Sequence, residues 1–223
     1  MARYDVIREI GESLAGIVRA EAKKQKVELE VVVGPFDQAF FAKKSSAVAL
    51  YLYEISYDHQ RQQELREFEV KGEHDQGEYT ILYPRPLAVD LRWAVAATGK
   101  TAADEHIALA VALKAFYDAP LLDAKTRQGE NFPERDLPID IDRAFTMEKQ
   151  TQLLASLGVP HHALLGYRIS TELKPERELR RTRRVERRSI ALFDKHHTPE
   201  GMGPDADRKK AAVAPAAAAG AKR

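Results

Sequence analysis

The chain has 223 residues, which is enough for one large domain or two small ones. Its 35 Lys and Arg residues nearly balance its 34 Asp and Glu residues, and the net charge of +1 argues against a surface built throughout for nucleic acid or acidic membranes. Cysteine is absent, which excludes disulfides, thiolate metal sites and cysteine nucleophiles. The N-terminal segment lacks the apolar core of a signal peptide and no run is long enough to span a bilayer. We therefore expect a protein that is cytoplasmic at synthesis, with no direct membrane insertion.

In chain order, the first third of the sequence predicts one helix followed by two strands. Apolar residues recur at helical spacing from Val6 to Val18 and predict an amphipathic helix. Alternating residues 27–33 predict a half-exposed strand, and residues 34–46 form a loop that carries three phenylalanines. Residues 47–58 are apolar on both sides. This strand is therefore either central or covered on its second face by another subunit.

The rest of the chain predicts further strands and two more helices. Polar residues 58–78 predict a long connection that leaves the sheet and contains a hairpin. Polar residues 123–136 predict a mobile loop. Apolar residues in segment 87–95 alternate with polar residues such as Asp90 and Arg92, and this alternation predicts another half-exposed strand. The remaining predicted elements are a helix from Thr101 or Asp104 to Tyr117, strand 139–141, a helix from Thr146 to Leu157, and strand 164–173.

These elements predict an α+β fold: a mainly antiparallel β-sheet flanked by amphipathic helices, which we expect on one face. We expect one domain over residues 1–194. Residues 195–223 are rich in Ala, Pro and Lys and have no large apolar side chain to dock, so they read as a flexible, disordered tail.

Residues 94–101 have the spacing of a phosphate-binding loop, with Lys100 placed for the outer phosphates and Thr101 for Mg²⁺. The polar face that Asp90 and Arg92 give to the preceding strand argues against that reading, because such strands are buried on both faces of a parallel sheet. We favour a glycine turn and a helix cap at Thr101. A nucleotide-binding enzyme that uses Lys100 is the alternative.

Two histidine pairs and two aspartates are the other candidates for chemistry. Neighbours on a strand point to opposite faces, so His161–His162 and His196–His197 are poor metal ligands. Asp140 and Asp142 could share a face for acid–base work or Ca²⁺, but no third ligand lies nearby, so a solvated strand face is favoured. With no catalytic motif in the sequence, we expect no enzyme activity, no cofactor and no metal.

Three groups of residues are candidates for contacts with other chains: the aromatic loop, the tyrosines of strand 47–58 and the arginine-rich segment. Aromatic side chains in a loop either anchor a neighbouring subunit or fold back on their own core. The arginine-rich segment 177–188 could contact phosphates or an acidic partner protein, or it could be a charged edge that prevents aggregation. The candidate interface residues are Phe36, Phe40, Phe41, Tyr51, Tyr53, Arg180, Arg181, Arg183 and Arg184.

Three segments in series resemble tail-terminator, or cap, proteins of phage-tail-like contractile injection systems. Ala49–Ile55 (ALYLYEI) resembles the leucine–tyrosine strand of that family, and Pro84–Trp93 (PRPLAVDLRW) resembles its Pro-Pro-Leu strand, with Trp93 where Tyr is usual. Leu109–Leu122 (LAVALKAFYDAPLL) is similar to the next helix and its Asp-x-Pro-x-Leu ending, with Ala110 where the family often has Gly. Order and spacing match over most of residues 6–173, and nothing carries over to residues 177–223.

The resemblance implies a non-enzymatic part of an injection particle. Six copies would form a ring on the end of the inner tube opposite the baseplate, stop tube and sheath polymerisation, and anchor the last sheath layer. The implied partners are the chain itself as a homohexamer, the tube protein and the sheath protein, with no small-molecule substrate and no nucleic acid. Tyr51, Tyr53 and the Phe40–Phe41 loop are then expected at or near subunit contacts. The alternative is a head–tail connector or DNA-contacting accessory that uses residues 177–188.

Overall fold

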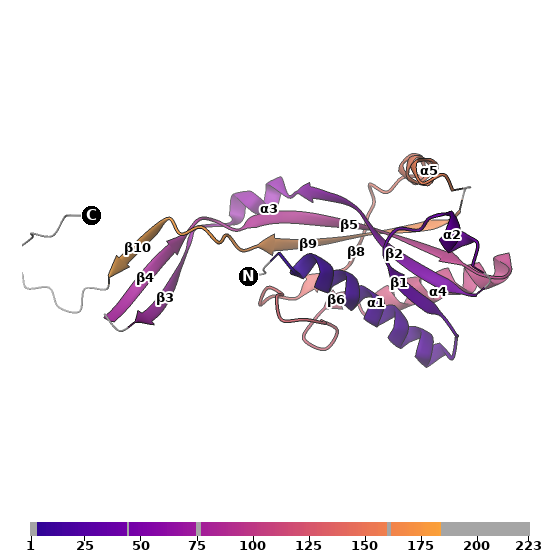
Figure 1. Cartoon of the computed structure of the whole chain (residues 1–223), viewed down its shortest axis with the longest axis horizontal. Coiled ribbons are helices and arrows are strands. Elements are labelled where there is room, and N and C mark those ends of the chain that lie inside the picture. The colour runs from indigo at the N-terminus through magenta and orange to yellow at the C-terminus, as the bar shows by residue number, and fades with distance from the viewer. Residues whose placement is uncertain (1–3, 44, 75–76, 160–161, 184–223) are drawn as a thin grey trace, which may run out of the picture. The chain divides into compact units, whose positions relative to one another are not determined.

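The computed structural model describes residues 4–43, 45–74, 77–159 and 162–183 (Figure 1). The chain divides into a compact unit, Met1–Arg184, and a second unit, Val185–Arg223, which lies outside the described residues. The elements are α1 (Val6–Gln25), β1 (Glu30–Val33), α2 (Gln38–Phe41), β2 (Ala47–Tyr57), α3 (His59–Glu64), β3 (Phe68–His74), β4 (Gly77–Tyr83), β5 (Leu87–Thr98), α4 (Ala102–Asp118), β6 (Leu121–Leu122), β7 (Leu137–Pro138), β8 (Asp140–Ile141), α5 (Met147–Ser156), β9 (Leu164–Leu173) and β10 (Arg180–Arg183).

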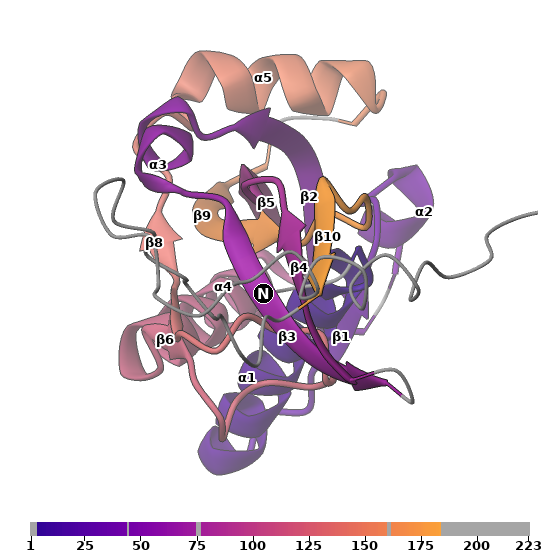
Figure 2. The same ribbon diagram turned by 90° about the vertical axis from the view of Figure 1, so that its left-hand side faces the viewer.

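A five-stranded sheet with the order β1-β2-β5-β9-β8 forms the centre of the compact unit. Every neighbouring pair is antiparallel except β1 and β2, which are parallel. Figure 2 shows β1 and β8 at opposite edges of this sheet. The predicted α+β class with a mainly antiparallel sheet is confirmed.

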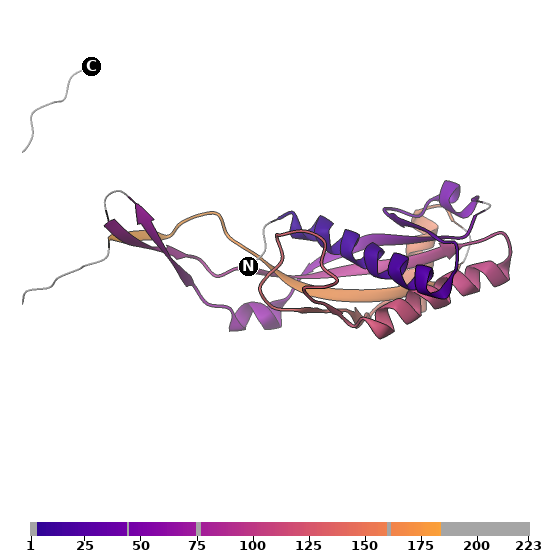
Figure 3. The ribbon, with the colours of Figure 1, turned by 90° about the horizontal axis from the view of Figure 1, so that it is seen from below.

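Helices cover both faces of the sheet. On one face, α1 and α4 pack side by side (Figure 3), and their apolar stripes join the sheet in one core cluster that includes Leu14, Trp93 and Phe116. On the other face, α2 and α5 form a second cluster around Phe36 and Leu154. The expectation that the helices lie on one face is therefore wrong, because the aromatic loop and α5 bury the second face (Figure 2).

Small residues allow close packing on that second face. Ala94 in β5 pairs with Gly166 in β9, and a Cβ at Gly166 would come within 2.5 Å of the ring of Phe145. Phe145 therefore lies directly against the sheet backbone, in front of α5. The segment before α5 can take this position because Gly166 has no side chain.

The predicted helix ends are confirmed by their capping geometry. Lys26 closes α1 in the left-handed conformation, with φ of 57°. Thr101 opens α4 in a capping box with Asp104. Thr146 caps the start of α5, and Gly158 follows its end with φ of 66°, a conformation that glycine adopts at little cost.

The polar excursion after β2 contains α3 and the predicted hairpin, formed by β3 and β4. The arginine-rich segment adds β10 to β4, giving a three-stranded sheet with the order β10-β4-β3. Its side chains belong to neither core cluster. Aromatic contacts stabilise it instead: Phe68 stacks on Tyr83 at 5.2 Å, and the Arg181 guanidinium lies 5.2 Å from the Tyr79 ring.

Two local predictions are wrong. Strand β5 is buried along nearly its whole length, because it lies between β2 and β9 and its charges have partners inside the protein. The polar loop 123–136 is held against α1 by hydrogen bonds. The Gln128 amide donates to Ser13 Oγ at 2.8 Å, and the Asn131 amide donates to Glu9 Oε2 at 2.9 Å.

Candidate assembly surfaces

The aromatic loop folds back on its own core. Asp37 caps the short helix α2 by accepting a hydrogen bond from the Phe40 amide at 2.8 Å. Phe36 and Phe40 are buried, and the Phe36 ring meets Tyr51 edge-on at 5.6 Å. Of the two interpretations of this loop, the intramolecular one describes Phe36 and Phe40. Any role for them at a subunit contact would be indirect and stays a prediction.

Phe41 is only partly buried and connects the loop to α4. Its ring stacks on His162 at 4.1 Å, and His162 Nδ1 lies 3.2 Å from Glu105 Oε1. His162 is therefore a packing residue here. His161, His196 and His197 lie outside the described residues. Within the ranges described, no group of three or more His, Asp or Glu side chains is placed to hold a metal ion.

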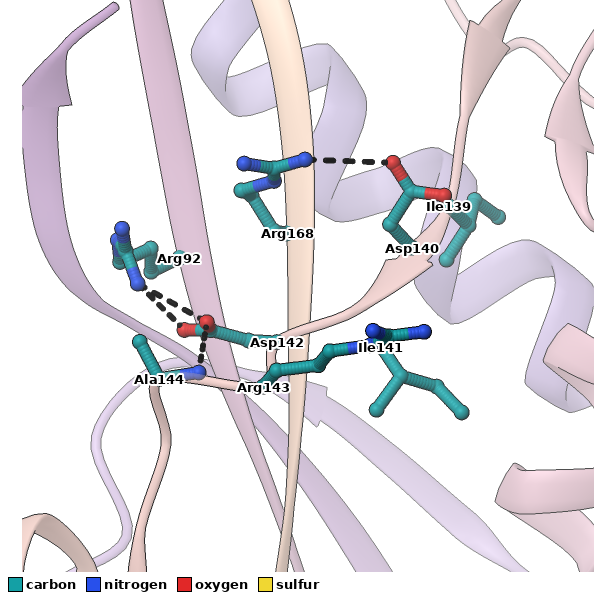
Figure 4. Close-up of a pocket in the computed structure, with 8 residues that line it drawn as sticks. All are labelled: Arg92, Ile139, Asp140, Ile141, Asp142, Arg143, Ala144 and Arg168. Atoms are coloured by element: carbon teal, nitrogen blue, oxygen red, sulfur yellow. Dashed lines mark hydrogen bonds and ion pairs between the residues drawn. The ribbon is translucent and has the colours of Figure 1, made fainter.

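Tyr53 belongs to an ionic cluster that joins four elements. Figure 4 shows Arg92, Asp142 and Ala144 of this cluster. Its hydroxyl donates to Asp142 Oδ2 at 2.8 Å, and Arg92 Nη1 donates to both oxygens of Asp142 at 2.9 Å. The Ala144 amide donates to Asp142 Oδ1 at 3.0 Å. Glu54 extends the cluster, since it lies 3.3 Å from Arg92 Nε and 3.5 Å from Lys149 of α5. The cluster thus ties β2 and β5 to the turn after β8 and to α5.

The cluster shifts the pKa values of its members. Burial alone would raise the pKa of Asp142, but hydrogen bonds from Tyr53 and the Ala144 amide and the charge of Arg92 together lower it. Burial and the hydrogen bond to Asp142 raise the pKa of Tyr53. Asp142 is therefore an ionised anchor and Tyr53 a neutral donor near neutral pH. Neither group has the pKa of an acid–base catalyst.

Asp140 and Asp142 do not share a solvated face. The side chain of Asp142 is only 3% exposed, whereas Asp140 is exposed and lies 3.7 Å from Arg168. The two carboxylates line one cavity of about 720 Å³, but each faces its own arginine (Figure 4). The favoured interpretation of a solvated strand face is therefore wrong for Asp142, because the turn after Ile141 directs its carboxylate inward to Arg92.

The segment around Lys100 is a helix cap. Strand β5 has antiparallel neighbours on both sides, unlike the strand before a phosphate-binding loop. The Asp104 amide donates to Thr101 Oγ1 at 3.2 Å, and Thr101 Oγ1 donates to Asp104 Oδ2 at 2.9 Å. The hydroxyl that would hold Mg²⁺ is thus engaged within the chain.

Strand β2 has an open edge. Strand β1 pairs only with Ala47–Leu50, so among the described residues no strand lies beside Tyr51–Tyr57 on that side. An apolar groove of about 500 Å³ adjoins this edge. The residues that line it come from α1, β1, β2, β5 and the segments just before α1 and after β1. They include Tyr4, Ile7, Val33, Pro35, Tyr51, Leu52 and Trp93. The sequence indicated a strand with two apolar sides but not the groove, which exists only once these four elements meet.

The arginine-rich segment lies partly within the described residues. Arg180 to Arg183 form β10, and Arg184 lies outside the described part. Arg181 Nη2 donates to Glu178 Oε1 at 2.8 Å, and the same guanidinium lies over Tyr79. Arg181 is thus held by contacts within the protein.

Comparison with known proteins identifies the fold and the family. The model of the Pvc16 N-terminal domain family matches residues 9–187 of the chain. The chain belongs to this family. A solved structure of the PVC sheath/tube terminator of an extracellular contractile injection system, in its extended state, is similar with a TM-score of 0.59 and 14% identity, over 92% of this chain and 69% of that one. The cap of the anti-feeding prophage, a tube-terminating cap, is similar with a TM-score of 0.54 and 15% identity, over 86% of this chain and 62% of that one.

The predicted resemblance to tail terminators is thus confirmed for this member of the Pvc16 N-terminal domain family. One of these solved structures is a sheath/tube terminator and the other is a tube-terminating cap. No curated protein matches the sequence. In the described part of the chain, no helix has the length and apolar character needed to cross a membrane.

Proposed function

We propose that this protein caps a contractile injection particle without catalysing a reaction. Six copies form a closed ring on the end of the tube opposite the baseplate, where the ring ends polymerisation of tube and sheath and anchors the last sheath layer. The observation that carries the proposal is the family match over residues 9–187 together with a terminator-like fold over 92% of the chain. Its partners are then its own copies, the tube protein and the sheath protein.

A cap that closes on itself needs surfaces that a single copy leaves uncovered, and the described residues include such surfaces. The edge of β2 from Tyr51 to Tyr57 is unpaired in the described residues, and an apolar groove lies beside it. These features support a contact between copies, because open edges and apolar patches are the usual sites of protein association. The predicted role of Tyr51 and Tyr53 near subunit contacts follows from their place on this edge.

Anchoring of the sheath requires a second type of surface, and we assign it to the three-stranded sheet. Strands β3 and β10 are its two outer strands, so each has an edge without a neighbour among the described residues. An extended segment of a sheath protein can join such an edge by strand addition, in which backbone hydrogen bonds supply much of the affinity.

The proposal is tested by electron microscopy of particles from a strain that lacks the gene. We expect overlong or unstable tails, and tails of normal length when the wild-type gene is restored. Normal particles of uniform length in the deletion strain would contradict a terminating role. Truncation at residue 184 is a useful second variant, since the described compact unit ends there.

The alternative of a DNA-contacting connector rests on the arginines of β10. Arg181 is already paired with Glu178, which reduces the positive charge that a phosphate would meet. Salt-sensitive retention of DNA that disappears on substitution of Arg180, Arg181, Arg183 and Arg184 by Ala would favour this alternative over the cap.

A further inference from the structure

A second apolar surface lies on the side of the molecule away from the groove. It consists of Leu113 and Tyr117 on the outer face of α4, Leu121 in β6 and Ile141 in β8, and we call it the α4–β8 patch. Tyr117 is 83% exposed and Ile141 is 70% exposed. Strand β6 is held next to β8 because the Ile139 amide donates to the Pro120 carbonyl at 2.8 Å. Single copies of a protein rarely expose a cluster of large apolar side chains without a partner.

The groove and the patch are the two ends of one row across the sheet. Leu52 in β2 is the cross-strand neighbour of Trp93 in β5, Trp93 is the neighbour of Tyr167 in β9, and Tyr167 is the neighbour of Ile141 in β8. Leu52 and Trp93 line the groove, and Ile141 belongs to the patch. The pairing places both surfaces at the same position along the strands. Since β1 and β8 are the two edges of the sheet (Figure 2), the groove lies toward one edge and the patch at the other.

Each surface also carries exposed charged residues beside its apolar ones. Asp5 and Arg8 line the groove together with its apolar residues, and Asp140 lies beside Ile141 of the patch. Arg8 is 74% exposed and meets Asp5 only at 3.9 Å. Asp140, beside Ile141, is half exposed and meets Arg168 at 3.7 Å. Each of these long ion pairs leaves a charge that an opposite charge on a second copy can attract.

Trp93 adds a further unsatisfied group. Its indole Nε1 is buried and has no hydrogen-bond partner among the described residues, although the ring lines the groove. Buried indole N–H groups usually have a partner. Because this N–H group is buried, a second copy in the groove would contact the Trp93 ring and not the N–H group.

We infer that the groove of one copy receives the α4–β8 patch of the next copy. Because the two surfaces differ and lie at opposite edges, the contact is head-to-tail, and it leaves a free groove and a free patch for further copies. Such a contact either closes into a ring or continues as a filament, and the angle between copies decides which. The inference rests on the proposed ring and names its subunit interface.

Cysteine cross-linking tests this interface directly, because the natural chain has no cysteine. The two full-length variants are Tyr4→Cys at the groove and Ile141→Cys in the patch, which are almost equally exposed. We expect a short bismaleimide to link the two variants when they are mixed, and to link neither variant to itself. Gln152→Cys, at an exposed position of α5, is the matched control and should give no product with Tyr4→Cys.

A second variant measures the contribution of the patch to assembly. Ile141→Asp should weaken self-association about tenfold or more, because it places a charge in an apolar contact. Gln152→Asp should leave self-association unchanged. Native mass spectrometry measures the self-association of both variants. If copies assemble but the mixed cysteines do not cross-link, or if one cysteine variant links to itself, this interface is wrong while the ring stands. If the wild-type chain stays a single copy at every concentration and with tube ends present, the proposed function itself is wrong.

Discussion

At the scale of single residues, the ion pair between Arg92 and Asp142 determines how the turn after β8 is fixed to the sheet. Removing one partner of a buried pair leaves the other charge without compensation, which costs about 3 kcal/mol. We therefore expect Asp142→Asn to lower the free energy of unfolding by about that amount. Urea denaturation followed by circular dichroism measures it. The control is Asp140→Asn, whose exposed pair with Arg168 contributes less than about 1 kcal/mol. Equal losses of unfolding free energy in Asp142→Asn and Asp140→Asn would contradict the stabilising role of the Arg92–Asp142 pair.

The same carboxylate predicts a pH dependence. The pKa of Asp142 is lowered in the folded protein, whereas an unfolded aspartate titrates near about 3.9. Its stabilising effect is therefore complete above the unfolded value and disappears as the pH falls through the folded value. We expect the stability gap between wild type and Asp142→Asn to be constant from neutral pH to about pH 5 and to shrink below about pH 4. A gap that is the same at pH 3 and pH 7 would contradict the lowered pKa.

The sequence identified Tyr53 and Asp142 as separate candidates but did not bring them together. Asp142 contacts Tyr53 across 89 sequence positions and Arg92 across 50. No local pattern contains such a contact. Only the pairing of β2 with β5, of β5 with β9 and of β9 with β8 brings these side chains to one place. The polar residues of β5 looked like a solvated face because their buried partners are distant in sequence.

At the scale of elements, the start of α4 decides between a helix cap and a phosphate-binding loop. We expect Thr101→Ala to lower the free energy of unfolding by about 1 kcal/mol, because the capping box is lost. Lys100→Ala, at an exposed neighbouring position, should change it by less than about 0.5 kcal/mol. The thermal midpoint of the wild type should not move when Mg²⁺ and ATP are added. A midpoint that rises with ATP, and no longer does so in Lys100→Ala, would restore the nucleotide-binding alternative.

The aromatic loop gives a second prediction at this scale. Phe40 is buried in the cluster between α2 and α5, so Phe40→Ser should lower the free energy of unfolding by about 3 kcal/mol or more. Phe41→Ser should lower the free energy of unfolding by a smaller amount, since Phe41 is only partly buried. The exposed neighbour Ala39 supplies the control, Ala39→Ser. Chemical denaturation checks all three. A fully stable Phe40→Ser variant with impaired assembly would instead support the anchoring of a neighbouring subunit.

Helices and strands with strong periodicity were predictable from the sequence, but the elements against which they pack were not. The amphipathic spacing of α1, the caps at Thr101 and Thr146 and the double-sided strand β2 are local signals, and the structure confirms them. The location of α5 on the second face, the burial of β5 and the pairing of β10 with β4 depend on long-range packing. The open edge of β2 also depends on a neighbour, because it results from the shortness of β1.

At the scale of the whole molecule, the described residues of one copy leave two apolar surfaces exposed. The row from Leu52 to Ile141 ends in a groove at one sheet edge and in an exposed patch at the other. A head-to-tail contact between these ends needs no new secondary structure. Closure of the ring would cover both surfaces in every copy, so that self-assembly stops there and the two faces of the ring are left for tube and sheath.

Electron microscopy of the purified full-length protein mixed with tube ends tests this claim most directly. We expect sixfold rings on one end of each tube, with an assembled mass six times the 25.1 kDa of the chain. Single copies scattered along the tube wall, or a protein that never leaves the 25.1 kDa state in the presence of tubes, would contradict it.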